Sequence, residues 1–378
     1  MTYNMLGMFS GAGGLDLGFE QAGFKHVGSM DWDPWSVATL RTNRPAWHVD
    51  QADAREWEFN EEVDVLVGGP PCQGYSLGGL RKATDDRNDL YEQVLRVAKA
   101  TRPRAIVIEN VLNLRTLLHP ETGRRFSDQI AFDLTELGYE VFHNVFRVDG
   151  FGVPQTRRRW IFVAFRGGAP AGYHLPLPGT NETVGPWLSD LGNGGGIGLP
   201  NHAPSWTFKS SVHTATGEPF DVDEPAVIAR FSRTASDGNP IRRFDQPFPA
   251  VDTATVWGWA QGNVVAKKFD KDRLAGKHIR NPDATVKLWR VSASRLRTMT
   301  ARELARLQTF PDDWEFIGGG ALRDIQMQVG NAVPVEFARR VGDSVRTALE
   351  AQDENRAFLA SDGASVPLVF PGWDPITA

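Results

Sequence analysis

The sequence predicts an α/β fold with a mostly parallel sheet, joined to a smaller, irregular domain that favours β-structure. Short apolar runs alternate with helical patterns through the first 166 residues, and strands that alternate with helices form parallel sheets covered on both faces. After Arg166 the chain becomes rich in Gly, Pro, Trp and Thr, and few helical patterns remain until about residue 300. This difference in sequence pattern predicts one regular α/β domain and one irregular domain.

The elements of the regular domain follow from apolar runs and their spacing. We expect strands at residues 5–9, 24–30, 63–67, 105–108, 140–148 and 160–165. We expect helices at residues 15–22, 34–41, 90–100, 126–137, 300–309 and 335–349. The chain from residue 353 onward shows no clear element.

Composition limits the class of protein. The 378 residues are 41% hydrophobic and 23% charged, as in an ordinary soluble globular protein. No run of about 18 apolar residues predicts a membrane span, and no secretory signal begins the chain, so we expect a cytoplasmic protein without a membrane partner. A single cysteine excludes an internal disulfide and a thiolate-rich zinc site, so no metal is expected.

Charge is segregated along the chain. The net charge is −5, but residues 265–306 hold twelve Lys or Arg and four Asp or Glu, a local charge of +8. A basic stretch on an acidic body is either a solvated face or a surface that meets phosphates.

The sole cysteine, Cys72, follows an apolar strand and a Gly-Gly-Pro-Pro turn. Most lone cysteines are small buried hydrophobes, whereas a thiol at the end of a strand is placed for reaction. A second candidate site begins at Gly11, Gly13 and Gly14, between a strand and a helix, where backbone N–H groups can meet a small molecule.

The glycine cluster is not a dinucleotide fingerprint, because Asp16 stands where the third glycine of that motif would fall. The next strand ends at Asp31, whose carboxylate is placed to hold ribose hydroxyls. Trp32 can cover an adenine face, and Asp53 can accept from the exocyclic amine. These residues favour a nucleoside site over a dehydrogenase.

Six ordered motifs over about residues 5–340 resemble those of the S-adenosylmethionine-dependent DNA (cytosine-5-)-methyltransferase family, of the bacterial restriction-modification type. They are Phe9-Ser10-Gly11-Ala12-Gly13-Gly14, Pro70-Pro71-Cys72-Gln73, Glu109-Asn110-Val111, Gln155-Thr156-Arg157-Arg158-Arg159, residues 302–311 and residues 328–334. The resemblance implies a Rossmann-like methyltransferase fold. One departure is Gly7, where the family commonly has an acidic residue, and this puts one polar interaction near the cofactor in doubt.

The resemblance implies transfer of a methyl group from S-adenosylmethionine to carbon 5 of a flipped cytosine in duplex DNA. Cys72 would attack carbon 6, Glu109 would act as an acid at N3, and Arg159, with Arg157 as its companion, would contact the base oxygen. The residues implied to bind the cofactor are Phe9, Ser10, Gly11, Ala12, Gly14, Asp31, Trp32, Asp53, Gly69, Pro71, Leu90, Asn331 and Ala332. Those expected to bind DNA phosphates from a loop after Cys72 are Ser76, Arg81, Lys82 and Arg87.

We expect residues 1–166, completed by about 325–352, to form the catalytic domain, and 167–299 to form a target-recognition domain and hinge. Residues 300–324 would be a motif helix and connection, and 353–378 a tail. Base readers are candidates only, among Arg230, Arg233, Arg242 and Arg243, while Trp257 and Trp259 are interpreted as core. We expect a monomer, with a partner restriction endonuclease encoded separately.

Two other functions stay open from the sequence. An RNA cytosine-5 methyltransferase would share the fold, but the variable region of over a hundred residues favours DNA. A DNA-binding regulator without catalysis would not need Cys72, Glu109 and the arginine pair.

Overall fold

The computed structural model describes residues 2–71, 90–194, 196, 198–202, 212–215, 226–229, 241–243, 245–251, 257–260, 267–269, 288–291, 296–319 and 322–361. Several predicted residues lie outside this set: Cys72, Ser76, Arg81, Lys82, Arg87, Arg230 and Arg233. The side chains of Arg242, Arg243, Trp257 and Trp259 are also outside it.

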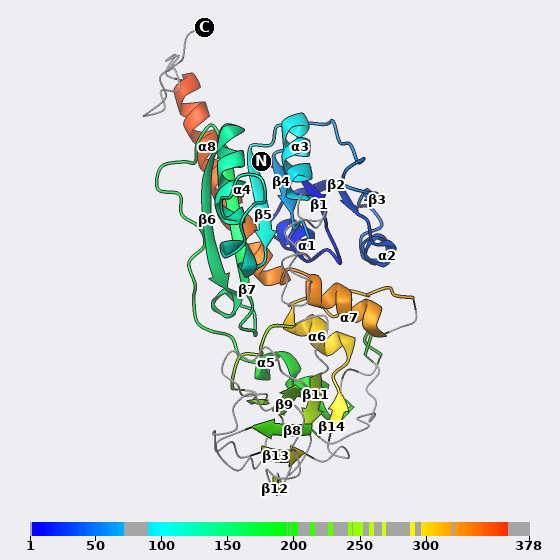
Figure 1. The fold of residues 1–378 in the computed structure, drawn as a ribbon. Helices are drawn as coiled ribbons and strands as arrows, with labels where there is room; N and C mark the ends of the chain where they lie inside the picture. The colour runs from blue at the N-terminus through cyan, green and yellow to red at the C-terminus, as the bar shows by residue number, and fades with distance from the viewer. Residues whose placement is uncertain are drawn as a thin grey trace.

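A seven-stranded sheet forms the centre of the larger part of the molecule (Figure 1). Its strands are β1 (Asn4–Met8), β2 (Lys25–Asp31), β3 (Val49–Gln51), β4 (Val65–Gly68), β5 (Ala105–Asn110), β6 (Tyr139–Arg147) and β7 (Arg158–Arg166). Their order is β3-β2-β1-β4-β5-β7-β6, and only the β5–β7 and β7–β6 pairs are antiparallel. The mostly parallel α/β sheet predicted from sequence is confirmed; the short strand β3 was not expected.

Helices cover both faces of this sheet. Side chains alternate between the two faces along each strand, and since they are apolar on both, each face must be buried against helices. On one face, Val65 and Val107 pack with α1 (Gly14–Gln21) and α8 (Val335–Ser361). On the other, Leu66 and Ile108 pack with α3 (Leu90–Thr101) and α4 (Phe126–Glu136). A third core lies around Trp314, between α2 (Pro34–Asn43), α5 (Gly185–Leu188), α6 (Ala301–Leu307) and α7 (Leu322–Asn331).

Helix α8 joins the far end of the chain to its beginning. A Cβ on Gly14 would lie 2.1 Å from the Val333 carbonyl oxygen, so only glycine lets α1 approach the segment before α8 this closely. The expectation that no element follows residue 353 was wrong, because α8 continues to Ser361. Asp353 accepts from the Tyr3 hydroxyl at 2.7 Å and pairs with Arg104, which anchors the extra turns.

The region after β7 is β-rich, as predicted. Its described strands are β8 (Val212–Ala215), β9 (Ala226–Ala229), β10 (Ile241–Arg243), β11 (Trp257–Ala260), β12 (Lys267–Phe269), β13 (Leu288–Val291) and β14 (Leu296–Thr298). They form two small antiparallel sheets, β10-β9-β11-β14 and β12-β13-β8. Figure 1 shows them at the end of the molecule away from the large sheet. Within the described ranges, no helix combines the length and apolarity that a bilayer span requires.

Candidate active site

The turn after β1, which we call the cofactor turn (Phe9–Gly13), is tightly wound. Phe9 has φ 55° and Gly11 has φ 53°, both in the left-handed region. Phe9 is strained there because its side chain disfavours that region, whereas Gly11 adopts it freely. The Gly11 N–H donates to Asp31 Oδ2 at 2.7 Å, so the turn folds back onto the end of β2. The predicted residues Phe9, Ser10, Gly11 and Ala12 are thus brought beside Asp31.

Asp31 is a half-buried carboxylate next to an exposed indole. Burial raises the pKa of Asp31 to about 6, while N–H groups of Asp33 and Gly11 pull the pKa the other way. Trp32 is 74% exposed, which is unusual for a tryptophan in a folded domain. A carboxylate that accepts from hydroxyls, beside a bare aromatic face, fits a nucleoside such as that of S-adenosylmethionine.

The Asp31 shift predicts a pH dependence of stability. The folded-state pKa of about 6 lies above the unfolded value near 3.9, so the protonated carboxyl favours folding. That stability is present below about pH 4 and is lost as the pH rises toward about 6. Wild type should therefore lose about 2 kcal/mol of stability through this group between pH 4 and 7 in urea unfolding, and Asp31→Asn, which does not titrate, should lack that loss whatever its stability at pH 4. Asp53→Asn is the control and should keep the wild-type loss of stability between pH 4 and 7, so an equal flattening in that variant would contradict the assignment.

The other predicted cofactor residues belong to several separate elements. Asp53 follows β3, and its carboxylate accepts from the Arg55 N–H at 3.0 Å and pairs with the Arg55 guanidinium. Leu90 is the first, buried residue of α3. Asn331 ends α7 and Ala332 follows, next to the Val333 carbonyl that meets Gly14. The structure therefore places the last motif against the start of α1.

Glu109 and Arg159 form a buried ion pair at the end of β5. Arg159 Nε lies 2.6 Å from Glu109 Oε1. Burial raises the pKa of Glu109 even though the Arg159 charge opposes that rise. Burial likewise lowers the pKa of Arg159, against the pull of Glu109. A carboxyl group with a raised pKa keeps its proton to higher pH than an exposed one and can donate that proton to a ring nitrogen.

The chain that leads to Cys72 runs directly past this pair. A Cβ on Gly69 would lie 3.4 Å from Glu109 Oε2. The Asn110 side-chain amide donates to the Pro70 carbonyl at 3.3 Å, which fixes the turn. Pro71, the last residue described here, immediately precedes Cys72. Because β4 lies between β1 and β5, this turn separates the cofactor turn from Glu109.

Arg157 is held by backbone carbonyls from two distant parts of the chain. Its side chain is buried, and Nη1 donates to the carbonyls of Val251 at 2.7 Å and Gly330 at 2.8 Å. Nη2 donates to the Asn331 carbonyl at 3.4 Å. The described contacts therefore connect Arg157 to the segments around Val251 and Gly330.

Arg157→Met should lower the free energy of unfolding by about 3 kcal/mol, because it leaves buried carbonyls without donors. Arg158→Met is the matched control, since Arg158 is exposed, and its effect should stay within about 0.5 kcal/mol. Urea denaturation measures both. Equal losses in the two variants would show that the carbonyl contacts are not the cause.

Sequence reasoning also missed two buried glutamines beside Arg157. Gln155 Nε2 donates to the Leu307 carbonyl at 2.6 Å and to Gln308 Oε1 at 2.9 Å, while Gln155 Oε1 accepts from the Val251 N–H. Gln308 Nε2 donates onward to the Val329 carbonyl at 2.7 Å. Both glutamines stood in recognised motifs, so the motif strings were the available signal, but only the fold shows that they meet.

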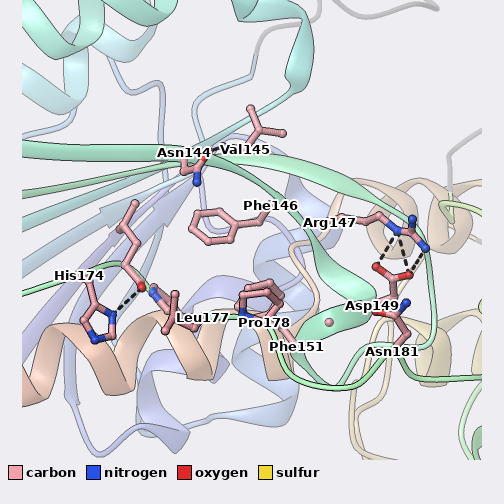
Figure 2. A pocket seen from close by; sticks show the side chains of 13 residues that line it. Asn144, Val145, Phe146, Arg147, Asp149, Phe151, His174, Leu177, Pro178 and Asn181 are labelled. Carbon is pink, nitrogen blue, oxygen red and sulfur yellow. Dashed lines mark hydrogen bonds and ion pairs between the residues drawn. The ribbon is translucent and has the colours of Figure 1, made fainter.

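A hollow of about 470 Å³ lies away from these residues, between β6, η3 (Val148–Phe151) and the segment 174–181 (Figure 2). Phe146, Phe151 and Leu177 line it, and Arg147 donates to Asp149 on η3. None of the predicted site residues is among those that line this hollow. The titratable groups with chemistry suited to catalysis lie at the ends of β2 and β5 instead.

Comparison with known proteins identifies the family of the whole chain. A family model described as C-5 cytosine-specific DNA methylase matches residues 3–192 and 201–347. The Type II methyltransferase M.PspPI of a Psychrobacter strain is 32% identical over 93% of this chain and 80% of its own length. The Type II methyltransferase M.NgoMIV of Neisseria gonorrhoeae is 30% identical over 93% of this chain and all of its own.

Solved structures agree on the fold. The Entamoeba histolytica methyltransferase EhMeth superposes with a TM-score of 0.60 at 15% identity, covering 92% of this chain and 99% of its own. The S. pombe Dnmt2 methyltransferase gives 0.55 at 16% identity, covering 93% and 99%. With the family model matching most of its length, the chain belongs to the C-5 cytosine-specific DNA methylases, enzymes that transfer a methyl group from S-adenosylmethionine to cytosine in DNA.

Proposed function

We propose that this enzyme methylates a cytosine flipped out of a specific duplex sequence, with Cys72 as nucleophile and Glu109 as acid. One observation carries the assignment of residues: the 2.6 Å Glu109–Arg159 pair lies beside Gly69, three residues before Cys72. A buried acid with a raised pKa next to the turn that bears the only thiol is the arrangement that covalent activation of a pyrimidine requires.

In the proposed mechanism, the Cys72 thiolate forms a bond to carbon 6 of the cytosine. Electron density moves toward carbon 5 and toward N3, where the Glu109 carboxyl donates its proton. Arg159 donates to the base oxygen and stabilises the charge that develops there. Bound S-adenosylmethionine supplies an electrophilic methyl group for carbon 5. Loss of the carbon 5 proton, with water as the proposed base, re-forms the double bond between carbons 5 and 6 as the bond from carbon 6 to the Cys72 sulfur breaks and the thiolate leaves. N3 then returns its proton to the Glu109 carboxylate.

We assign the cofactor to the turn Phe9–Gly13, with Asp31 at the ribose hydroxyls and Trp32 at the adenine. The Gly11 N–H bond to Asp31 supports this, because it fixes the carboxylate that would accept those hydroxyls. Gly14, Asp53, Gly69, Pro71, Leu90, Asn331 and Ala332 complete the proposed site. Arg157, given its carbonyl contacts, is proposed to position rather than touch the base.

The DNA-binding residues and the biological setting are proposed from the sequence and from the named relatives. Ser76, Arg81, Lys82 and Arg87 are assigned to phosphates, and the β-rich region 167–299 to sequence recognition. The relatives named Type II methyltransferases support a modification enzyme that works with a separately encoded endonuclease. We propose a monomer that acts in the cytoplasm at the nucleoid.

Base-resolution sequencing of 5-methylcytosine in DNA incubated with the enzyme tests the function and reveals the target together. The expected result is methylation confined to one short sequence. A parallel incubation with labelled S-adenosylmethionine and transfer RNA should give no product. Label in RNA alone, or methylation without sequence preference, would contradict the proposal.

A further inference from the structure

Gly7 on β1 has no side chain because the carboxylate of Asp16 occupies that space. A Cβ built on Gly7 would lie 2.1 Å from Asp16 Oδ1 and 2.8 Å from Ser10 Oγ. A carbon cannot approach either oxygen so closely, so no larger residue fits at position 7 while Asp16 keeps its place. The glycine and the aspartate therefore form a matched pair.

Asp16 is held beneath the cofactor turn by two polar partners. It lies in the first turn of α1 and is 1% exposed. Its Oδ1 accepts from the Ser10 hydroxyl at 2.9 Å. The same oxygen lies 3.4 Å from His26 Nε2, whose side chain is also 1% exposed. A carboxylate buried so fully needs such partners, and Ser10 is the one that belongs to the cofactor turn.

Ser10 connects this carboxylate to the groups assigned to the cofactor. It stands between the two left-handed residues Phe9 and Gly11, so its hydroxyl anchor fixes the strained part of the turn. The next N–H, that of Gly11, donates to Asp31 Oδ2. Loss of the Asp16 carboxylate therefore frees the Ser10 hydroxyl, and this loosens the turn whose Gly11 N–H holds the Asp31 carboxylate in place for the ribose.

We propose that Asp16, on α1, is a positioning residue for S-adenosylmethionine binding, and that its carboxylate fills the space that a side chain at position 7 of β1 would otherwise occupy. This rests on the proposed placement of the cofactor at the turn. A Cβ at position 7 would also come within 2.8 Å of Ser10 Oγ, so a carboxylate moved from α1 to β1 requires the Ser10 hydroxyl to rotate away from its present place.

Calorimetric titration with S-adenosylmethionine tests the proposal without any methyl transfer. Asp16→Ala should weaken cofactor affinity about tenfold or more, since a buried hydrogen bond to a charged group is lost. Asp16→Asn keeps an oxygen acceptor for Ser10 and should stay within about threefold of wild type. The double variant Gly7→Asp/Asp16→Ala should regain a measurable part of the lost affinity, because the new carboxylate can accept from Ser10 once the Ser10 hydroxyl has rotated to admit it.

Asp149→Ala is the matched control for a lost buried carboxylate. Asp149, on η3 beside the hollow of Figure 2, is also 1% exposed and pairs with Arg147 at the end of β6. The Asp149→Ala variant should have a lower melting temperature than wild type and an unchanged affinity for S-adenosylmethionine. Wild-type affinity in Asp16→Ala would overturn the proposal, as would a double variant that binds as weakly as Asp16→Ala. A wild-type protein that binds no cofactor would instead overturn the placement of the cofactor itself.

Should Asp16→Ala not fold, the double variant decides the question. A folded double variant that binds S-adenosylmethionine supports the transfer of the carboxylate to β1. A double variant that also fails to fold overturns it.

Discussion

Cys72→Ser is expected to abolish methyl transfer, with a loss in kcat of about 10⁴-fold or more. A serine hydroxyl is not ionised near neutral pH, so it cannot attack carbon 6 as a thiolate can. Binding of duplex DNA should stay near the wild-type affinity, because the substitution removes no charge that meets phosphate. Single-turnover assays with labelled S-adenosylmethionine and filter binding at one salt concentration measure the two quantities.

The single thiol provides an internal control for this variant. Cys72 is the only cysteine among the 378 residues, so a thiol-directed reagent can act on no other cysteine. It should inactivate the wild-type enzyme in step with modification of one sulfur and leave Cys72→Ser unlabelled. Undiminished turnover in Cys72→Ser would sink the nucleophile assignment, and inactivation of the wild type without labelling would place the sensitive group elsewhere.

Local pattern was sufficient to predict most of the large sheet. Residues 105–108 form a short apolar run bounded by polar residues, the pattern that parallel strands commonly show because both of their faces are buried. The structure buries this strand on both faces. The end of α8 was missed because its last turns are polar. Asp353 is anchored by Tyr3 and Arg104, which stand 350 and 249 residues away in the chain, so no local signal marks the helix there.

Some residues of the candidate site could likewise be placed from local sequence pattern, whereas others depend on contacts between distant parts of the chain. Asp31 and Glu109 stand at or near the carboxyl ends of parallel strands, and such ends gather at one edge of a sheet, so their closeness to the site could be anticipated. The resemblance assigned the base contact to Arg159 and made Arg157 its companion, but the burial of Arg157 could not be predicted, because three consecutive arginines look alike in sequence. Only the approach of Val251 and Gly330 gives Arg157 its carbonyls, and these contacts span 94 and 173 residues. From the sequence, Asp16 was noted only because it stands where a dinucleotide-binding motif would have its third glycine. Its closeness to Gly7 could not be predicted, because it arises only when α1 folds against β1.

Glu109→Gln is expected to lower kcat by about 10²- to 10⁴-fold with a smaller change in KM for DNA. The amide can still donate a hydrogen bond to N3 but cannot transfer a proton to it. Burial holds the pKa of Glu109 above its usual range, so its protonated form persists to higher pH than an exposed carboxyl allows. Activity that requires this proton falls as the pH rises through the Glu109 pKa. The wild-type profile should therefore show a falling limb that Glu109→Gln lacks.

Arg159 gives this pH dependence a second, independent test. Its guanidinium lies 2.6 Å from Glu109 Oε1 and favours the ionised carboxylate, so removing that charge raises the Glu109 pKa further. In Arg159→Gln, the falling limb of kcat should move to higher pH, on top of a lower plateau from the lost contact with the base oxygen. Arg158→Gln is the matched control, because Arg158 is exposed and no described contact joins it to Glu109. A limb that stays in place in Arg159→Gln would mean that Glu109 is not the group whose proton limits turnover.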